Sequence, residues 1–286
     1  MSVSISSISQ IPLAKKTYTK ILEYGFVPRR PFAHYFMNTD GIRSRIHLQN
    51  YYSIFFPDTL VDAEATIWLH DMSGKLISTT KKKLKPFGQI YLELNDLLSD
   101  EGETEGMVYV DLKPPSEIRE LLKNIPRIIE NESSTPFWVS YHDENENYMY
   151  VHSIESYRAK VFGAIWPVRK LMERAVPNRP AWQSWRLLDV QLLDELQIIV
   201  MNHSHLPGVS SAKLLDENSE VVWNEEFHLE PRAAKRIKIP SELISRWKGE
   251  GNFSLVRIGV DPLFTSNGKP YVLLKYGGGP QSIHHG

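Results

Sequence analysis

Short runs of alternating apolar and polar residues cover much of the chain, which is the pattern of strands that bury one face. The clearest examples are Leu76–Leu84 and Val221–Leu229. Each follows a polar tetrad, 71–74 or 216–219, whose Asp, Asn, Ser and Gly residues close hairpins because they tolerate left-handed backbone angles or bond their own backbone. A proline lies two residues after each run and marks a strand end, because it cannot donate to a ladder.

Further strands are expected wherever an apolar run of strand length is bounded by turn residues. In the first half of the chain these runs are 51–56, 65–69, 89–94, 107–112, 137–141 and Tyr148–His152. In the second half they are 196–201, 212–215, 236–239, 253–260, Tyr271–Tyr276 and 282–284. Many short strands with regularly spaced turns favour a sandwich or jelly roll over a parallel α/β sheet.

The two halves match each other when the chain is shifted by 145 residues. This offset places Asp71 on Asp216 and brings apolar, turn and proline positions into one register. The matched pairs include Leu48 and Leu193, Ile54 and Ile199, Leu69 and Leu214, Leu84 and Leu229, and Pro86 and Pro231. Because few of the matched residues are identical, the shared rhythm of positions is what indicates an internal duplication.

These patterns predict a mainly β protein built from two tandem β-sandwich or jelly-roll-like units. The first unit is expected at 1–156, with a short helical insertion at about 116–130, and the second unit at 186–286. The connecting segment, 157–185, contains three tryptophans and a helix candidate that is bounded by prolines. We expect this helical linker to pack between the units, so that they are docked together.

Composition narrows the function. With 42% hydrophobic residues, 23% charged residues and a net charge of −1, the chain is an ordinary globular protein without the basic character of a nucleic-acid partner. The absence of cysteine excludes disulfides, thiolate nucleophiles and thiolate metal sites. No secretory signal and no apolar run near the about 20 residues of a membrane helix are found. We expect a cytoplasmic protein with no membrane partner, alone or as a homo-oligomer.

Histidines offer one candidate site. His203 and His205 are separated by a single residue and, with His284 from the last strand, could supply nitrogen ligands to a divalent metal cofactor at one end of the second unit. This hypothesis makes the chain a metal-dependent enzyme. The alternative is that these are surface histidines of loops and the chain terminus.

Aromatic residues offer the other candidate site. Flat rings exposed on a sheet can stack on sugars or anchor a protein partner, whereas buried rings only fill a core. The candidates on expected strands are Trp138, Tyr141, Tyr148, Tyr150, Trp223, Tyr271 and Tyr276. Since no nucleotide-binding, hydrolase, zinc-peptidase or kinase motif occurs, the leading hypothesis is a non-enzymatic binding or scaffold protein. It would hold a carbohydrate or protein partner on an aromatic-lined sheet face or in the cleft between units.

Overall fold

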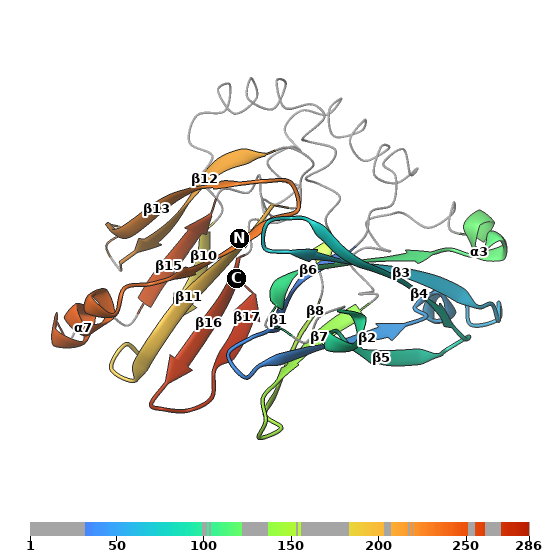
Figure 1. The fold of residues 1–286 in the computed structure, drawn as a ribbon, viewed down its shortest axis with the longest axis horizontal. Coiled ribbons are helices and arrows are strands. Elements are labelled where there is room, and N and C mark those ends of the chain that lie inside the picture. Colours follow the sequence, from blue (N-terminus) through green and yellow to red (C-terminus); the bar gives the residue numbers. More distant parts are fainter. Residues whose placement is uncertain are drawn as a thin grey trace.

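A computed structural model describes residues 32–98, 102, 104–121, 137–152, 154–155, 183–202, 207–216, 218, 220–250, 255–260 and 270–285. These residues form antiparallel sheets with a few short helices, which confirms the mainly β fold class. Figure 1 shows two layered β structures lying side by side, the first in blue to green and the second in yellow to red. We refer to residues 32–155 as the first unit and to residues 183–285 as the second.

The first unit has two facing sheets. Their strand orders are β4-β3-β6-β1-β9 and β5-β2-β7-β8, and all pairs are antiparallel. The strands are β1 (Phe32–Asn38), β2 (Arg43–Gln49), β3 (Ala63–Asp71), β4 (Leu76–Leu84), β5 (Gln89–Glu93), β6 (Thr104–Lys113), β7 (Phe137–His142), β8 (Tyr148–His152) and β9 (Ile154–Glu155). The helices are α2 (Tyr52–Phe55), η2 (Asn95–Leu97) and α3 (Ser116–Leu121).

The second unit repeats this arrangement. Its sheets run β13-β12-β15-β10 and β14-β11-β16-β17, so that eight strands follow each other in the same spatial order as β1 to β8. The elements are β10 (Gln183–Leu187), β11 (Leu193–Met201), β12 (Gly208–Leu215), β13 (Val221–Leu229), β14 (Ala234–Lys238), α7 (Ser241–Glu250), β15 (Leu255–Val260), β16 (Tyr271–Tyr276) and β17 (Ser282–His285). The shared order is what a duplication would produce, and the duplication itself stays our interpretation.

The turn between the fourth and fifth strands has the same geometry in both units. Pro86 and Pro231 are each followed by a residue with a left-handed backbone, Phe87 (φ 53°) and Arg232 (φ 68°). A proline followed by a positive φ is the signature of a type II turn. In each unit the residue after the left-handed one, Gly88 or Ala233, donates its backbone N–H back across the turn, at 2.8 Å and 3.1 Å.

A buried asparagine holds each of these turns in place. Asn50 donates its side-chain amide to the carbonyl oxygens of Val61 and Lys85, at 3.0 and 3.1 Å. Asn202 does the same to Leu229 and Glu230, at 3.2 and 3.0 Å. Both asparagine side chains are almost fully excluded from solvent, so water competes little for the donors of these bonds.

The structure corrects the register proposed for the first strands. The segment 51–56 is expected as a strand but contains helix α2, and the strand equivalent to β11 is β2. The residue of β11 that is equivalent to Leu48 of β2 is therefore Val200, not Leu193. The offset of 145 holds for β4 and β5, whereas the loop before β3 is longer in the first unit. A short apolar run does not by itself distinguish a strand from a helical turn.

One further boundary differs from the expected one, and two expected helical segments lie partly or wholly outside the described residues. Strand β10 begins at Gln183, so the second unit starts inside the segment expected as linker. Helix α3 ends at Leu121 within the described residues, and the rest of the expected insertion lies outside them. The expected helix of the linker also lies outside the described residues.

The hydrophobic core of the first unit extends into the second unit, which also has a core cluster of its own. The buried cluster of the first unit includes Tyr271, Leu273 and Ile283 from the second unit, each at most 3% exposed. The Tyr271 ring lies 4.6 Å from the ring of His34, a buried residue of β1. Because burial of such side chains is the main favourable contribution to folding, the units are held as one body.

A second contact between the units lies at the type II turn of the second unit. The guanidinium of Arg232 lies 4.3 Å from the centre of the Tyr109 ring, and the backbone N–H of Ala234 donates to Met72 at 3.1 Å. At the β3–β4 hairpin, a Cβ on Gly74 would lie 2.2 Å from the carbonyl oxygen of Pro231. This close approach, together with a φ of 87°, explains why glycine occupies that position.

Replacing either turn asparagine tests the equivalence of the two turns. We expect Asn50→Ala and Asn202→Ala each to lower the free energy of unfolding by about 2–4 kcal/mol, because each removes a buried side chain and the two hydrogen bonds that hold the turn. Urea denaturation measures the effect. Asn145→Ala, at an exposed hairpin tip, is the control and should change stability by less than about 0.5 kcal/mol. A small effect at only one turn would contradict the equivalence.

His70 makes the stability pH-dependent. Burial, and then the charge of Arg232, lowers the pKa of His70 to about 4. Below pH 6.5 the unfolded chain takes up a proton that the folded chain accepts only near pH 4, so stability falls as the pH falls through this range. For this partly solvated ring we expect a loss of about 1 kcal/mol between pH 7 and pH 5. His70→Gln should remove that part of the dependence in denaturation experiments at both pH values; an unchanged difference would show that His70 does not cause it.

Candidate binding face and inter-unit cleft

The sheet β5-β2-β7-β8 presents one face to the core and the other to solvent. Residues alternate between these faces, so Ile46, Leu48 and Val139 are buried while their neighbours in sequence point outward. We call the solvent side the outer face; in Figure 1 it is the lower side of the first unit. The register gives it three rows across the strands: Tyr91–His47–Trp138, Glu93–Arg45–Ser140–Tyr150 and Arg43–His142–Tyr148.

Four aromatic rings of this face are open to solvent. Tyr91 is 68% exposed, Tyr150 57%, Trp138 41% and Tyr148 40%. The rings come from three strands and surround the polar residues of the middle row. Large rings left this exposed on a folded surface are a signal of binding rather than of packing.

The two tyrosines of β8 form an aligned pair. Their ring planes differ by 20° and their centres are 6.2 Å apart, and Tyr148 also stacks on His142 at 5.2 Å. Tyr150 lies 5.4 Å from the imidazole of His47. Because Tyr148 and Tyr150 each contact other rings of the face, this part of the aromatic surface is preorganised before any ligand arrives.

The polar residues between the rings are held by one another. Arg45 forms an ion pair with Glu93, and its guanidinium lies 5.2 Å from the centre of the Tyr91 ring and 5.8 Å from that of Tyr148. His47 and the Ser140 hydroxyl are 2.8 Å apart. Burial, and then the charge of Arg45, lowers the pKa of His47, so this imidazole is neutral at pH 7 and can donate or accept a hydrogen bond.

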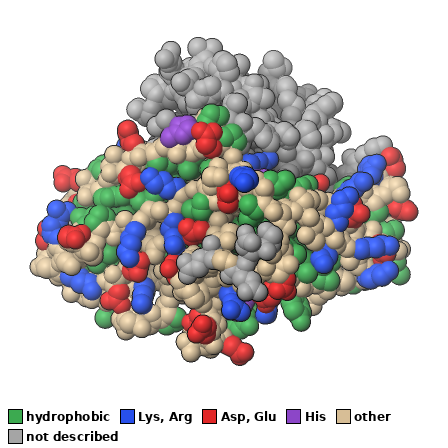
Figure 2. All heavy atoms as spheres, viewed as in Figure 1, with side chains coloured by type: hydrophobic (Ala, Val, Ile, Leu, Met, Phe, Trp, Pro, Cys, Tyr) green, Lys and Arg blue, Asp and Glu red, His purple; other side chains and the backbone are tan. Residues whose placement is uncertain are grey.

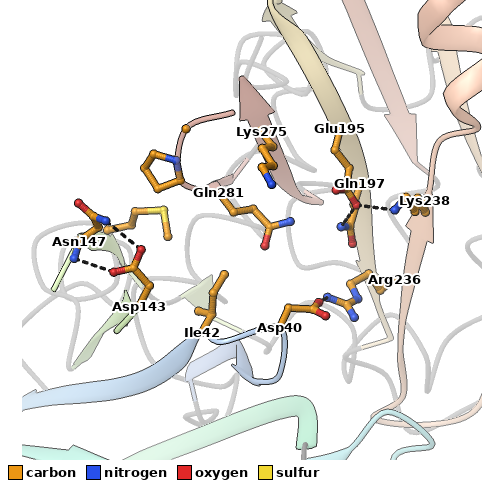
Figure 3. A pocket seen from close by; sticks show the side chains of 13 residues that line it. Asp40, Ile42, Asp143, Asn147, Glu195, Gln197, Arg236, Lys238, Lys275 and Gln281 are labelled. Carbon is orange, nitrogen blue, oxygen red and sulfur yellow. Dashed lines mark hydrogen bonds and ion pairs between the residues drawn. The ribbon is translucent and has the colours of Figure 1, made fainter. Parts of the chain in front are cut away.

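The inter-unit cleft is the second candidate. It has a volume of about 510 Å³ and is lined by Asp40, Ile42, Asp143, Asn147, Met149, Glu195, Gln197, Arg236, Lys238, Lys275, Gly279, Pro280 and Gln281. Figure 3 shows Lys275, Gln281 and Asp40 pointing into it from both units. Arg236 spans its edge, forming ion pairs with Asp40 at 2.7 Å and with Glu105 at 3.3 Å.

The cleft and the outer face lie on equivalent sheet surfaces. The strand registers place Gln197 where the first unit has Arg45, Lys238 in place of Glu93, and Lys275 in place of His142. Part of the second unit's surface is buried against the first unit, and the remainder lines the cleft. The same face of the fold is therefore aromatic and open in one unit, and charged and half-covered in the other.

Four of the seven aromatic candidates lie elsewhere. Tyr141 and Tyr271 are fully buried, and Tyr141 donates its hydroxyl proton to the carbonyl oxygen of Tyr35 in the core. Neither ring has surface open to a ligand in this structure, so neither belongs to the outer face. Trp223 and Tyr276 are half-buried against the core of the second unit.

The sequence analysis proposed three of the four exposed rings of the outer face, but neither Tyr91 nor the polar residues between the rings. Tyr91 lies on β5, and Arg45 and His47 on β2, a strand that was not expected. Its sequence alternates, with polar residues at every second position. This alternation predicts a strand, but it is a weaker signal than the continuous apolar run that follows it, because its outward positions are charged or polar.

Of the three histidines proposed as metal ligands, the structure describes His284. His203 and His205 lie outside the described residues, and His284 is exposed on β17 opposite Val272. In the described part of the chain, no three His, Asp or Glu side chains are grouped so as to hold a metal ion.

The surface and the helices carry two further findings. On the side seen in Figure 2, acidic and basic side chains are intermixed over both units rather than separated by sign.

Among the described helices, none has the length and apolar character needed to span a bilayer.

Comparison with known proteins gives little. No family model and no curated protein matches the sequence. Among solved structures, a protein described as a β-galactosidase from Bacteroides fragilis matches 92% of this chain and 34% of its own, at 12% identity and a TM-score of 0.17. The Pleurotus ostreatus lectin matches 90% of this chain and 75% of its own, at 9% identity and a TM-score of 0.20. The chain spans about a third of the first of these proteins. TM-scores this low support no conclusion about this chain.

Proposed function

We propose that the protein is a non-enzymatic recognition protein that binds a saccharide on the outer face of its first unit. The observation that carries this proposal is the set of four exposed rings, Tyr91, Trp138, Tyr148 and Tyr150, arranged around polar groups on one sheet surface. The apolar faces of sugar rings stack on aromatic side chains, while their hydroxyl groups need donors and acceptors nearby.

The polar groups supply both kinds of partner. Glu93 and the neutral His47 can accept hydrogen bonds, and Arg45 can donate them, while the buried Ser140 hydroxyl only orients His47. The ion pair between Arg45 and Glu93 and the contact between His47 and Ser140 hold these groups in fixed positions. A ligand that meets such a preorganised surface loses less free energy to ordering of side chains.

A protein partner fits this surface less well. Glutamate is depleted at protein–protein interfaces, whereas Glu93, paired with Arg45, lies in the middle row of the outer face. Burying this pair under another protein would remove water from both charges at a cost. A sugar keeps hydroxyl groups, and bridging water, in contact with them.

Removing the tyrosines of β8 tests the saccharide proposal. We expect Tyr148→Ala and Tyr150→Ala each to weaken binding to a soluble polysaccharide about three- to tenfold, because each removes one stacking ring. Affinity electrophoresis in gels containing xylan, galactomannan, mixed-linkage β-glucan or pectin measures the retardation. Phe87→Ala is the matched control: its ring is 61% exposed but lies at the β4–β5 turn, outside the three rows.

Two results would contradict the proposal. One is the absence of retardation of the wild-type protein in all four gels and of binding to a glycan array. The other is retardation that Tyr148→Ala and Tyr150→Ala leave unchanged, which would place any saccharide site elsewhere. Light scattering would separately test the homo-oligomer, which stays a prediction.

A further inference from the structure

The carboxylates that line the inter-unit cleft already have partners. Asp40 forms an ion pair with Arg236 at 2.7 Å, and Glu195 forms one with Lys238 at 2.9 Å. Asp143 accepts three hydrogen bonds at the β7–β8 hairpin, from the backbone N–H groups of residues 145 and 147 and from the Asn147 amide, at 2.8–3.0 Å. None of these groups requires a ligand to be satisfied.

Lys275 and Gln281 differ from the rest of the lining. Both side chains point into the cleft (Figure 3). Among the described residues, no carboxylate lies within ion-pair distance of the Lys275 ammonium, and the Gln281 amide has no hydrogen-bond partner. Glu195, which faces Lys275 across the strands, is instead paired with Lys238 and accepts a hydrogen bond from Gln197 at 2.6 Å.

The position of Lys275 is the second observation. By strand register it occupies the place that His142 has on the outer face of the first unit, where His142 stacks on Tyr148. The second unit thus carries a cation at a position that, in the first unit, belongs to the proposed binding surface. The enclosing residues of the first unit, among them Asp40 and Ile42, turn this part of the sheet into a cleft.

We propose that the inter-unit cleft binds a small molecule bearing one carboxylate, which the Lys275 ammonium and the Gln281 amide hold. A charge-assisted hydrogen bond from an ammonium to a carboxylate is stronger than a neutral one. A single unpaired cation matches a single negative charge, and the neighbouring carboxylates of Asp40 and Glu195 would repel a more highly charged anion. The volume of about 510 Å³ accommodates a ligand the size of a monosaccharide.

Titration calorimetry with three probes tests the assignment. Galacturonate and galactose have the same ring and differ at the carboxylate, and lactate is a hydroxy acid without a sugar ring. We expect galacturonate to bind at least tenfold more tightly than galactose, and Lys275→Gln to weaken galacturonate binding about tenfold or more. Gln281→Ala, which alters a side chain without a protein partner, should weaken it less. Comparable binding of lactate would mean that the carboxylate alone is recognised.

The control is Lys213→Gln, an equivalent loss of charge at an exposed lysine on β12, in the other sheet of the second unit. It should leave galacturonate binding unchanged. Thermal unfolding of each variant shows whether it folds, and Gln281→Ala remains informative if Lys275→Gln does not. The proposal is overturned if neither acid binds at about 10 mM, if galactose binds as tightly as galacturonate, or if both cleft variants bind like the wild type.

The register argument for the cleft draws on the saccharide proposal for the outer face, but the two sites are tested by different variants and different ligands. Tyr148→Ala and Tyr150→Ala should leave galacturonate titrations unaffected, and Lys275→Gln should leave polysaccharide retardation unaffected. Loss of both activities in one variant that still unfolds cooperatively would show a single site instead of two.

Discussion

Burial of one sheet face of the second unit against the first is the contact on which the rest of the structure depends. Tyr271, Leu273 and Ile283 complete the core of the first unit, and the type II turn of the second unit rests on Tyr109. This contact decides which surfaces remain accessible. The outer face of the first unit is left open, while the equivalent face of the second unit is divided between a shared core and the lining of a cleft.

The same fold therefore presents two different surfaces for recognition. Both are built from the sheet that contains the second, fifth, seventh and eighth strands of a unit. In the first unit the outward positions carry rings and a fixed ion pair, a combination suited to stacking and hydrogen bonding. In the second unit they carry Lys238, Gln197 and Lys275, suited to binding an anion. Since side-chain direction is fixed by strand register, a few substitutions at outward positions can change the ligand without disturbing the fold.

The sequence predicted the strands and turns correctly where turn residues, prolines and alternating apolar residues occur together. The hairpins that begin at Asp71 and Asp216, the strands Leu76–Leu84 and Val221–Leu229, and the prolines after them appear at the expected positions. The sequence pattern predicted the wrong strand near Ile54. The continuous apolar run there was taken as a strand, whereas the strand is the alternating segment Arg43–Gln49 just before it. Of the outer face, Trp138, Tyr148 and Tyr150 were expected, but their partners on β2 and β5 were not.

The sequence by itself determined the class of fold and the turns, because alternation, turn residues and prolines act over a few neighbouring positions. It also located the strands that carry most of the exposed rings. Only the tertiary structure decided which rings are exposed: Tyr141 and Tyr148 lie on adjacent strands of one hairpin, yet one is buried and the other is open. The physical reason is that exposure depends on strand register and on the packing of a distant unit, and neither is encoded in the local pattern of residues.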